Sequence, residues 1–365
     1  MRSLPATGVS SRLSPAETQP ATAWVASLSP WPERFGLDRI HRLLERLGHP
    51  ERRYPAIHVV GTNGKSTATR TIAALLKAGG RRAGAYTSPH VSGWPERIWV
   101  DGAEADFEGA VARIRADAEA IGATQFEALT AAALAEFAER QVDVAVVEAG
   151  IGGRLDATNV VDAEVVLLTN VSPEHTEVLG ETPEQIAREK LAVAHAARVV
   201  VLPDNKHTEL IPKSAEIIEG GIREAAEAFL GRSIVHDLHA DLPGRLERRG
   251  RELWDGAHNP AGAAWLRAHV DERYDVVVAS ILGDKDANAM LADLAQLAPS
   301  LIATQSTNPR ALSADELARL AGAHFTHVTT EPDPERALTR ARESTRGGIL
   351  VTGSLYLLAD LADNP

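Results

Sequence analysis

Residues 56–67 read AIHVVGTNGKST, and this segment decides the fold of the chain around it. Its first five residues are apolar except for one histidine, as in a strand buried inside a sheet. A loop with glycines at positions 61 and 64 follows, and apolar residues then recur at helical spacing over 66–78. A strand, a glycine-rich loop and a helix in this order direct backbone N–H groups and a helix N-terminus toward a bound phosphate. We therefore predict a phosphate-binding loop here.

The side chains of this loop are suited to a nucleotide and a metal ion. Lys65 supplies a positive charge for the terminal phosphates, and the hydroxyl of Ser66 or Thr67 can bind magnesium. The spacing departs from the general pattern G-x-x-x-x-G-K-[ST], because Val59 stands where the first glycine would be. The structural alternative is an ordinary turn between a strand and a helix, with a surface lysine. The predicted ATP-binding residues of the loop are Gly61, Thr62, Asn63, Gly64, Lys65, Ser66 and Thr67.

Short apolar runs alternate with longer helical patterns along the chain, which indicates parallel sheets covered by helices. We predict an α/β fold with a P-loop NTPase-like, parallel-sheet ATP-binding domain over 22–241 and a smaller Rossmann-like α/β domain over 242–365. A flexible N-terminal segment is expected over 1–21. The predicted strands are 56–60, 83–87, 142–148, 165–170, 199–202, 253–254, 275–279, 301–304, 324–328 and 348–352. The predicted helices are 66–78, 126–140, 183–197 and 287–297, while 204–240 carries a weak strand signal.

The composition excludes several classes of protein. No cysteine is present, so metal ligands must be oxygen or imidazole groups, and thiolate sites and cysteine nucleophiles are excluded. The formal net charge of −12 argues against nucleic-acid binding through phosphate contacts. No run reaches the ~20 apolar residues of a membrane span, and the N-terminal region lacks the apolar core of a signal peptide. We expect a cytoplasmic protein with no nucleic-acid or membrane partner.

Glu148 ends the apolar run 142–148, which places a carboxylate at the carboxyl end of a buried strand. Ligands of open α/β sheets bind at this edge, so Glu148 is positioned to hold magnesium against the phosphate loop. The alternative is an exposed glutamate at the end of a strand. The segment AGIGGRLDATN, residues 149–159, follows directly and favours the functional interpretation.

Several segments resemble the folylpolyglutamate synthase and dihydrofolate synthase family of the Mur ligase superfamily. The loop GTNGKS looks like the phosphate loop of the superfamily, and residues 149–159 closely resemble the family signature G-L-G-G-R-L-D-A-T-N. The resemblance runs from about residue 24 to residue 358. Further similar segments are YTSPH at 86–90, FEALT at 126–130, SPEH at 172–175, LPGR at 242–245, WDGAHNP at 254–260, GDKD at 283–286 and TGSLY at 352–356.

The resemblance implies an ATP- and magnesium-dependent ligase. Such an enzyme joins the amine of glutamate to the carboxylate of folate or dihydropteroate through an acyl phosphate, with two magnesium ions. By resemblance, Ser88, Glu148 and His175 join Ser66 and Thr67 as metal ligands, and Lys190 carries a carbamate that binds the second ion. Lys65, Lys190 and His258 are the implied catalytic residues. An arginine suits a triphosphate oxygen and an aspartate a ribose hydroxyl, so Arg245 and Asp255 complete the ATP site. The implied substrate-binding residues are Gln125, Phe126, Glu127, Leu155, Asp156 and Ala157.

Structural alternatives stand beside these roles. Phe126 also suits a core position, Lys190 a solvated helix surface, and Asn259 with Pro260 the start of a helix. Two features depart from the family. The stretch between residues 202 and 242 is short, without the L-P-x-x-N-A segment that usually touches the nucleotide, and Ser66 replaces the usual glycine. A Mur-type ligase acting on another carboxylate, or a nucleotide-binding relative without activity, therefore remains an alternative. We expect a monomer.

Overall fold

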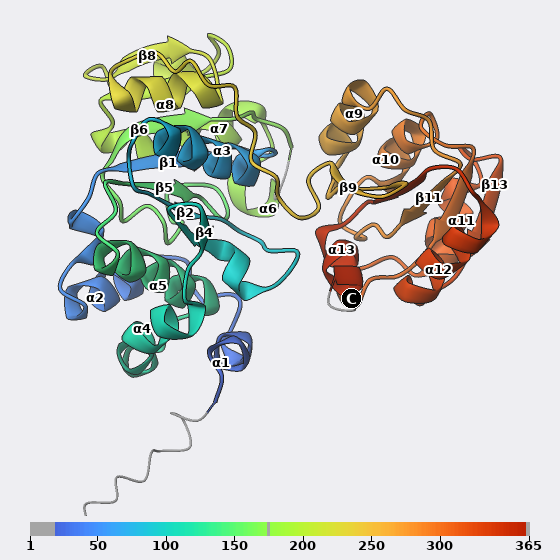
Figure 1. The fold of residues 1–365 in the computed structure, drawn as a ribbon, viewed down its shortest axis with the longest axis horizontal. Helices are drawn as coiled ribbons and strands as arrows, with labels where there is room; N and C mark the ends of the chain where they lie inside the picture. Colours follow the sequence, from blue (N-terminus) through green and yellow to red (C-terminus); the bar gives the residue numbers. More distant parts are fainter. Residues whose placement is uncertain (1–18, 174–175, 363–365) are drawn as a thin grey trace, which may run out of the picture.

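Two separate β-sheets organise the chain, which the computed structural model describes over residues 19–173 and 176–362 (Figure 1). The first sheet has eight strands in the order β4-β3-β2-β5-β1-β6-β7-β8. All neighbouring pairs are parallel except β2 with β3 and β3 with β4. Its strands are β1 (Ala56–Val60), β2 (Ala83–Tyr86), β3 (Ile98–Val100), β4 (Ala103–Glu104), β5 (Val144–Glu148), β6 (Ala163–Leu168), β7 (Val199–Leu202) and β8 (Glu216–Glu219).

Helices cover both faces of the first sheet because most of its strands are apolar on both sides. One face packs against α3 and α8, and the opposite face against α1, α2, α4, α5 and the region of α7 and η4. The helices are α1 (Ala21–Ser27), α2 (Asp38–Arg46), α3 (Lys65–Ala78), α4 (Phe107–Ile121), α5 (Gln125–Glu139), α6 (Thr176–Leu179), α7 (Pro183–Leu191) and α8 (Ile222–Leu230). Short 3₁₀ helices are η2 (Pro50–Arg52), η3 (Trp94–Arg97), η4 (Ala192–Ala196) and η5 (Thr208–Leu210).

The second sheet has six strands in the order β13-β12-β11-β14-β10-β9, and only the pair β9 with β10 is antiparallel. Helices α9, α10 and α11 pack on one face, and α12 and α13 on the other. The strands are β9 (Glu247–Arg249), β10 (Glu252–Trp254), β11 (Val276–Ala279), β12 (Ser300–Ala303), β13 (His327–Thr330) and β14 (Ile349–Thr352). The helices are α9 (Pro260–His269), α10 (Ala287–Leu294), α11 (Ala314–Ala321), α12 (Pro334–Ser344) and α13 (Leu355–Ala362).

The predicted α/β fold, with a larger parallel-sheet unit followed by a smaller one, is confirmed. Two strand predictions were displaced. β6 spans Ala163–Leu168 rather than 165–170. β13 spans His327–Thr330 rather than 324–328, because the chain turns after α11 and the amide of Phe325 bonds back to Ala321. The weak region 204–240 does contain a strand and a helix, β8 and α8. The first sheet ends at Glu219 and the second begins at Glu247, and the domain limits 1–21, 22–241 and 242–365 stay predictions.

One valine of the first unit packs inside the second. Val91 is 1% exposed and belongs to the apolar cluster of Trp254, Leu355 and Leu358, on the face that α12 and α13 cover. The loop around it is held by Glu96, whose Oε2 accepts from the amide of Val91 at 2.8 Å and from the amide of Ser92 at 2.7 Å. A loop that leaves β2 in one unit therefore contributes to the core of the other.

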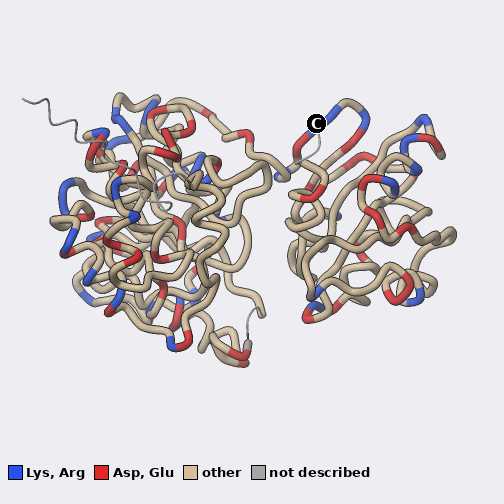
Figure 2. The backbone as a smooth tube through the Cα atoms, turned by 90° about the horizontal axis from the view of Figure 1, so that it is seen from below, with Lys and Arg blue, Asp and Glu red and all other residues tan. Residues whose placement is uncertain are grey.

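The charged residues are spread over both units, with Lys and Arg interspersed among Asp and Glu (Figure 2). The tube in Figure 2 shows no long stretch of a single sign in either unit. Over residues 19–173 and 176–362, no helix has the length and apolar character needed to cross a membrane.

Candidate active site

The phosphate loop leaves the centre of the first sheet, because β1 lies between β5 and β6. Gly61 follows β1 with a φ of +146°, and a Cβ at this position would lie 1.9 Å from the Thr169 hydroxyl. Gly64 precedes the first turn of α3 with a φ of +79°. Side chains rarely adopt these backbone angles, and Gly61 also has no space for one. The two glycines therefore set the path of the loop.

Residues after β6 hold the loop from its side. The amide of Asn63 donates to Oδ1 of Asn170 at 3.0 Å, and the carbonyl of Asn63 accepts from Nδ2 of the same residue at 3.0 Å. The hydroxyl of Thr169 donates to that carbonyl at 2.7 Å. Thr62 exchanges hydrogen bonds with the backbone of Ser172 through its hydroxyl, at 3.1 Å in both directions. The loop is thus fixed before any ligand binds.

Two lysines donate to carbonyls of the loop. Nζ of Lys65 donates to the Thr62 carbonyl at 3.1 Å, and Nζ of Lys190 donates to the Gly61 carbonyl at 2.7 Å. Lys190 lies on α7 and is only 2% exposed, so it is not a solvated surface lysine. Thr67 is half-buried in the first turn of α3. The loop therefore carries positive charge from two elements that are distant in sequence.

Glu148 lies at the same edge, at the end of β5. Its Oε1 accepts from the Ser66 hydroxyl and its Oε2 from the Ser88 amide, each at 3.0 Å. Burial raises the pKa of Glu148 to about 7, and the nearby charge of Lys65 and the bonds from Ser88 and Ser66 oppose this rise. A divalent cation would compensate such a buried carboxylate, so the oxygen groups here fit magnesium.

The remaining predicted metal ligand, His175, lies outside the described residues. Within the part that the structure describes, no three His, Asp or Glu side chains gather into a metal-binding group. The described ligand candidates are therefore one carboxylate, Glu148, and the hydroxyl groups around it.

The segment 149–159 folds back against this edge. Both oxygens of Asp156 are engaged: Oδ2 accepts from the Ile151 amide at 2.8 Å, and Oδ1 from the amide and hydroxyl of Thr158. Burial raises the pKa of Asp156, and these hydrogen bonds oppose the rise. Leu155 is 48% exposed, whereas Ala157 is buried. The exposed Leu155 side chain is thus free of the core, and Asp156 shapes the segment itself.

Gln125 and Phe126, two of the predicted substrate-binding residues, lie at the start of α5 and contact different parts of the first unit. The ring of Phe126 packs beside Gly150, where a Cβ would lie 2.6 Å from its Cζ, and 6.1 Å from the Tyr86 ring centre. Nε2 of Gln125 donates to the carbonyl of Val25 in α1 at 3.0 Å. Phe126 therefore contacts segment 149–159 through Gly150.

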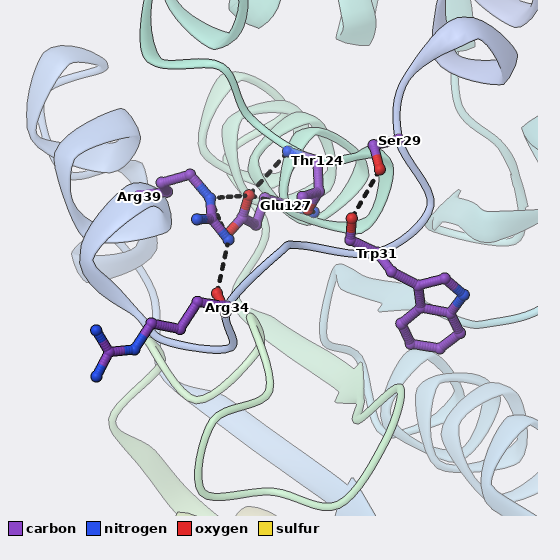
Figure 3. A network of polar contacts seen from close by, with 6 residues as sticks. All are labelled: Ser29, Trp31, Arg34, Arg39, Thr124 and Glu127. Atoms are coloured by element: carbon purple, nitrogen blue, oxygen red, sulfur yellow. Dashed lines mark hydrogen bonds and ion pairs between the residues drawn. The ribbon is translucent and has the colours of Figure 1, made fainter. Parts of the chain in front are cut away.

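Glu127 has a structural environment. It closes a capping box at the start of α5, where its Oε2 accepts from the Thr124 amide at 2.8 Å. Its carboxylate also pairs with Arg39 of α2, with Nε 3.0 Å from Oε2 (Figure 3). Figure 3 shows the Arg39 guanidinium between Glu127 and the backbone of Arg34. The predicted role of Glu127 in substrate binding stays a prediction.

The second unit reaches the phosphate loop through the start of α9. Asn259 and Asn63 exchange two hydrogen bonds through their side-chain amides, at 2.9 and 3.2 Å. Asp255 is buried, and its carboxylate accepts from the amides of Leu246 at 3.0 Å and Ala257 at 2.9 Å. Burial raises its pKa. Nη1 of Arg245 donates to the Gly244 carbonyl at 3.1 Å, and the positive charge of this arginine opposes the rise in the pKa of both Asp255 and Glu148.

His258 follows Asp255 in the same turn. Its Nδ1 lies 2.8 Å from the Gly256 carbonyl and donates to it, because a carbonyl oxygen only accepts. This contact fixes the tautomer of the neutral ring.

Sequence reasoning assigned no role to three residues that this arrangement uses. Asn170 holds the phosphate loop, and its position at the end of an apolar run next to that loop was the available signal. Arg97 is buried, donates to Nδ1 of His90 at 2.8 Å and interacts electrostatically with Glu148. His58 is fully buried inside β1, and a histidine within an apolar strand was its only signal.

Two protein families match the chain in succession. The Mur ligase middle domain matches residues 59–241, and the Mur ligase glutamate ligase domain matches residues 244–355. A dihydrofolate synthase/folylpolyglutamate synthase of Mycobacterium tuberculosis is 33% identical over an alignment 428 residues long, gaps included. The alignment covers 92% of this chain and 86% of the relative.

Solved structures agree with these matches over nearly the whole chain. The E. coli protein FolC in complex with DHPP and ADP has a TM-score of 0.83 and 26% identity, covering 95% of this chain and 98% of the other. The bifunctional folylpolyglutamate synthase/dihydrofolate synthase with Mn, AMPPNP and L-glutamate bound has a TM-score of 0.80 and 28% identity. It covers 94% of this chain and 98% of its own. The Yersinia pestis enzyme with AMPPNP and a Mn ion has the same TM-score and identity.

Proposed function

The chain belongs to the dihydrofolate synthase/folylpolyglutamate synthase family of Mur ligases, and from this we propose an ATP-dependent ligase that joins glutamate to a folate-type carboxylate. The observation that carries the proposal is the meeting of the phosphate loop and Glu148 at one sheet edge, through the 3.0 Å contact from Ser66. The start of α9 in the second unit is hydrogen-bonded to the same loop.

The reaction needs activation because a carboxylate is a poor electrophile. In the proposed sequence, a carboxylate oxygen of the acceptor attacks the γ-phosphorus of ATP, the bond from phosphorus to the bridging oxygen breaks, and ADP leaves. The amine of glutamate then attacks the acyl carbon, and phosphate departs with the electron pair of the C–O bond. The amine loses a proton, for which His258 is the proposed acceptor.

The chain supplies binding and charge for this transfer. The loop amides and Lys65 bind the phosphates, and Ser66, Thr67, Ser88 and Glu148 are the described candidates to hold magnesium, together with His175. Bound magnesium would neutralise negative charge on the phosphates. Arg245 and Asp255 are proposed to contact the nucleotide from the second unit.

Two magnesium ions and a carbamate on Lys190 are finer proposals. Their support is the burial of Lys190 and the 2.7 Å contact from its Nζ to Gly61, which put this side chain at the start of the phosphate loop. Intact-protein mass spectrometry under native conditions tests the carbamate as a mass increase of one CO₂. Loss of that increase in Lys190→Arg would agree with the proposal, and an unmodified wild-type protein that is fully active would contradict it.

The central test measures ADP release with glutamate and an acceptor. Lys65→Ala should abolish release, because the charge next to the transferred group is lost. Lys77→Ala is the matched control on the same helix, since Lys77 lies at the exposed end of α3 and pairs with Asp101. Normal release by Lys65→Ala would contradict the assignment of the loop.

The acceptor is tested by comparing dihydropteroate, tetrahydrofolate and cell-wall nucleotides, each with glutamate. Mass analysis of the product then shows whether glutamate has been added. Turnover of only a cell-wall nucleotide would favour the Mur-type alternative, and ATP binding without turnover would favour an inactive relative. We also propose a cytoplasmic monomer, and light scattering that gives a dimer mass would contradict the monomer.

A further inference from the structure

A buried histidine of β1 is hydrogen-bonded to the segment 149–159. His58 is 0% exposed, and its Nε2 lies 2.9 Å from the hydroxyl oxygen of Thr158. Thr158 is also fully buried, and its hydroxyl contacts Oδ1 of Asp156. Asp156 in turn accepts from the Ile151 amide at 2.8 Å. Three side chains therefore link the strand that carries the phosphate loop to the turn that follows β5.

The direction of each hydrogen bond follows from the groups involved. A carboxylate oxygen only accepts, so the Thr158 hydroxyl donates to Asp156 and has its lone pairs left for His58. His58 must then donate through Nε2, which fixes the neutral tautomer with the proton on that atom. Burial lowers the pKa of His58 to about 3, so the ring is neutral at pH 7. Nδ1 has no hydrogen-bond partner in the described part of the chain.

The same segment is tied to the other end of β1. A Cβ on Gly153 would lie 2.5 Å from the carbonyl oxygen of Lys190, so the two backbones touch. The Lys190 side chain donates to the carbonyl of Gly61 at 2.7 Å. Segment 149–159 is thus attached to β1 through His58 and to the start of the phosphate loop through Lys190. A carboxylate that receives the terminal phosphoryl group has to approach the phosphate loop, to whose start this segment is attached through Lys190.

We propose that His58 and Thr158 are positioning residues, whose hydrogen bonds hold Asp156 and thereby set the shape of the acceptor side of the site. This proposal rests on the proposed function for the identity of the acceptor. Neither side chain contacts the reacting atoms: both act through Asp156. Loss of either hydrogen bond loosens segment 149–159 and weakens acceptor binding, while the phosphate loop keeps its own contacts to Asn170.

Thr158 offers a matched pair of variants. Thr158→Val keeps the shape of the side chain and removes the hydroxyl, whereas Thr158→Ser keeps the hydroxyl. Thr158→Val should raise KM for the acceptor about 10-fold or more, with KM for ATP within about 2-fold of wild type, because a lost hydrogen bond changes an equilibrium by about that factor. Thr158→Ser should stay within about 2-fold for both. Equal rises in both KM values, or a serine variant as impaired as the valine variant, would overturn the proposal.

Variants of His58 provide a second test of the proposal. His58→Gln retains an N–H donor of similar reach and should behave closer to wild type than His58→Leu. The double variant His58→Leu with Thr158→Val should be no worse in acceptor KM than the single valine variant, since both remove the same chain of contacts. If the increases in acceptor KM of the two single variants multiply in the double variant, the two residues act independently and the proposal is contradicted.

A readout without turnover separates this proposal from the proposed function. Hydrogen exchange of the Ile151 and Thr158 amides, both bonded to Asp156, should be about 10-fold faster or more in Thr158→Val than in Thr158→Ser. Exchange in the phosphate loop should be unchanged. If wild type turns over no folate-type acceptor, the proposed function fails, and the exchange rates still decide the positioning role. Unchanged exchange in segment 149–159 would overturn it.

Discussion

Asn63 and Asn259 exchange two side-chain hydrogen bonds although 196 residues separate them in sequence. The first belongs to the phosphate loop, and the second caps α9, where its Oδ1 also accepts from the Gly262 amide at 2.8 Å. This amide pair is a direct polar contact between the two α/β units. The position of the second unit is therefore linked to the conformation of the phosphate loop.

A double-mutant cycle on this pair should give non-additive stabilities. Asn63→Ala removes only the contact between units, whereas Asn259→Ala also removes a helix cap. We expect a coupling free energy of about 1–2 kcal/mol, since two neutral hydrogen bonds are shared. Urea unfolding of the four proteins measures it, with Asn205→Ala, at an exposed amide that donates to Glu219, as the control. Additive effects would show that the pair contributes nothing.

Gly61→Ala should disrupt the phosphate loop. The added Cβ would lie 1.9 Å from the Thr169 hydroxyl, and the φ of +146° strains any residue with a side chain. We expect a loss of stability of about 1–3 kcal/mol and nucleotide binding weakened at least about 10-fold. Calorimetric titration with ADP and thermal unfolding measure these effects.

Gly36→Ala is the control for this substitution, because a Cβ there meets no atom within 4 Å. It should bind nucleotide like the wild type. Wild-type affinity in Gly61→Ala would show that the loop tolerates a different path from the one described.

The ion pair of Arg39 and Glu127 should stabilise the first unit more than an exposed pair does. Glu127 has a side-chain exposure of 6% and Arg39 of 28%, so Arg39→Ala leaves a buried carboxylate without its charge partner. We expect Arg39→Ala to cost about 2–4 kcal/mol of unfolding free energy. Arg46→Ala is the control, because the pair of Arg46 and Asp117 is 53% and 29% exposed and should contribute less than about 1 kcal/mol.

The variant Glu127→Gln distinguishes a structural role of Glu127 from a role in substrate binding. A structural role predicts that Glu127→Gln lowers the melting temperature with little change in acceptor KM for the folded protein. A predominant role in substrate binding predicts the reverse, and a raised KM at unchanged melting temperature would contradict the structural assignment.

Stability should fall in acid partly through His58. The imidazole of the unfolded chain takes up a proton below about pH 6.5, whereas burial keeps the folded-state pKa at about 3. The unfolded state thus binds more protons between these values, so its relative stability rises as the pH falls through this window. The free energy of unfolding should decrease by at most about 1.4 kcal/mol per pH unit for this group.

Urea unfolding of wild type and His58→Gln, at about five pH values between pH 7.5 and pH 5, isolates the contribution of His58 to the pH dependence of the unfolding free energy. His90, whose pKa burial also lowers to about 3, acts in the same direction in both proteins and cancels in the comparison. Identical pH slopes for the two proteins would show that the pKa of His58 is the same in the folded and unfolded states, which contradicts the prediction.

Much of the first sheet could be predicted because its inner strands are buried on both faces. The run 56–60 is apolar except for His58, the run 144–147 is apolar throughout, and the glycines at 61 and 64 mark the loop that follows β1. The carboxyl edge of a parallel sheet then brings Glu148 to that loop without further information. The edge strand β8 could not be predicted in this way, because its sequence EIIE is largely exposed and has polar ends.

The contacts between distant segments could not be predicted from local patterns. Nothing near Gln125 or Glu127 in sequence indicates that their side chains contact Val25 and Arg39. The link from Lys190 to Gly61 depends on the packing of α7 beside segment 149–159, which no periodicity encodes. A motif predicts which residues gather at a site, but the orientation of each side chain is decided by the packing around it.

The loop that carries Val91 fastens the first unit to the second. The side chain of Val91 is inserted among Trp254 and Leu358, while the amide of Ser88, three positions earlier, is hydrogen-bonded to Glu148. A rotation that separates the two units must do one of two things. It either exposes the Val91 side chain to water, at a cost of about 1.5–3 kcal/mol, or moves the loop from Ser88 to Val91 together with the second unit. Separation of the units would therefore put tension on the backbone between Val91 and Ser88, next to the buried carboxylate of Glu148.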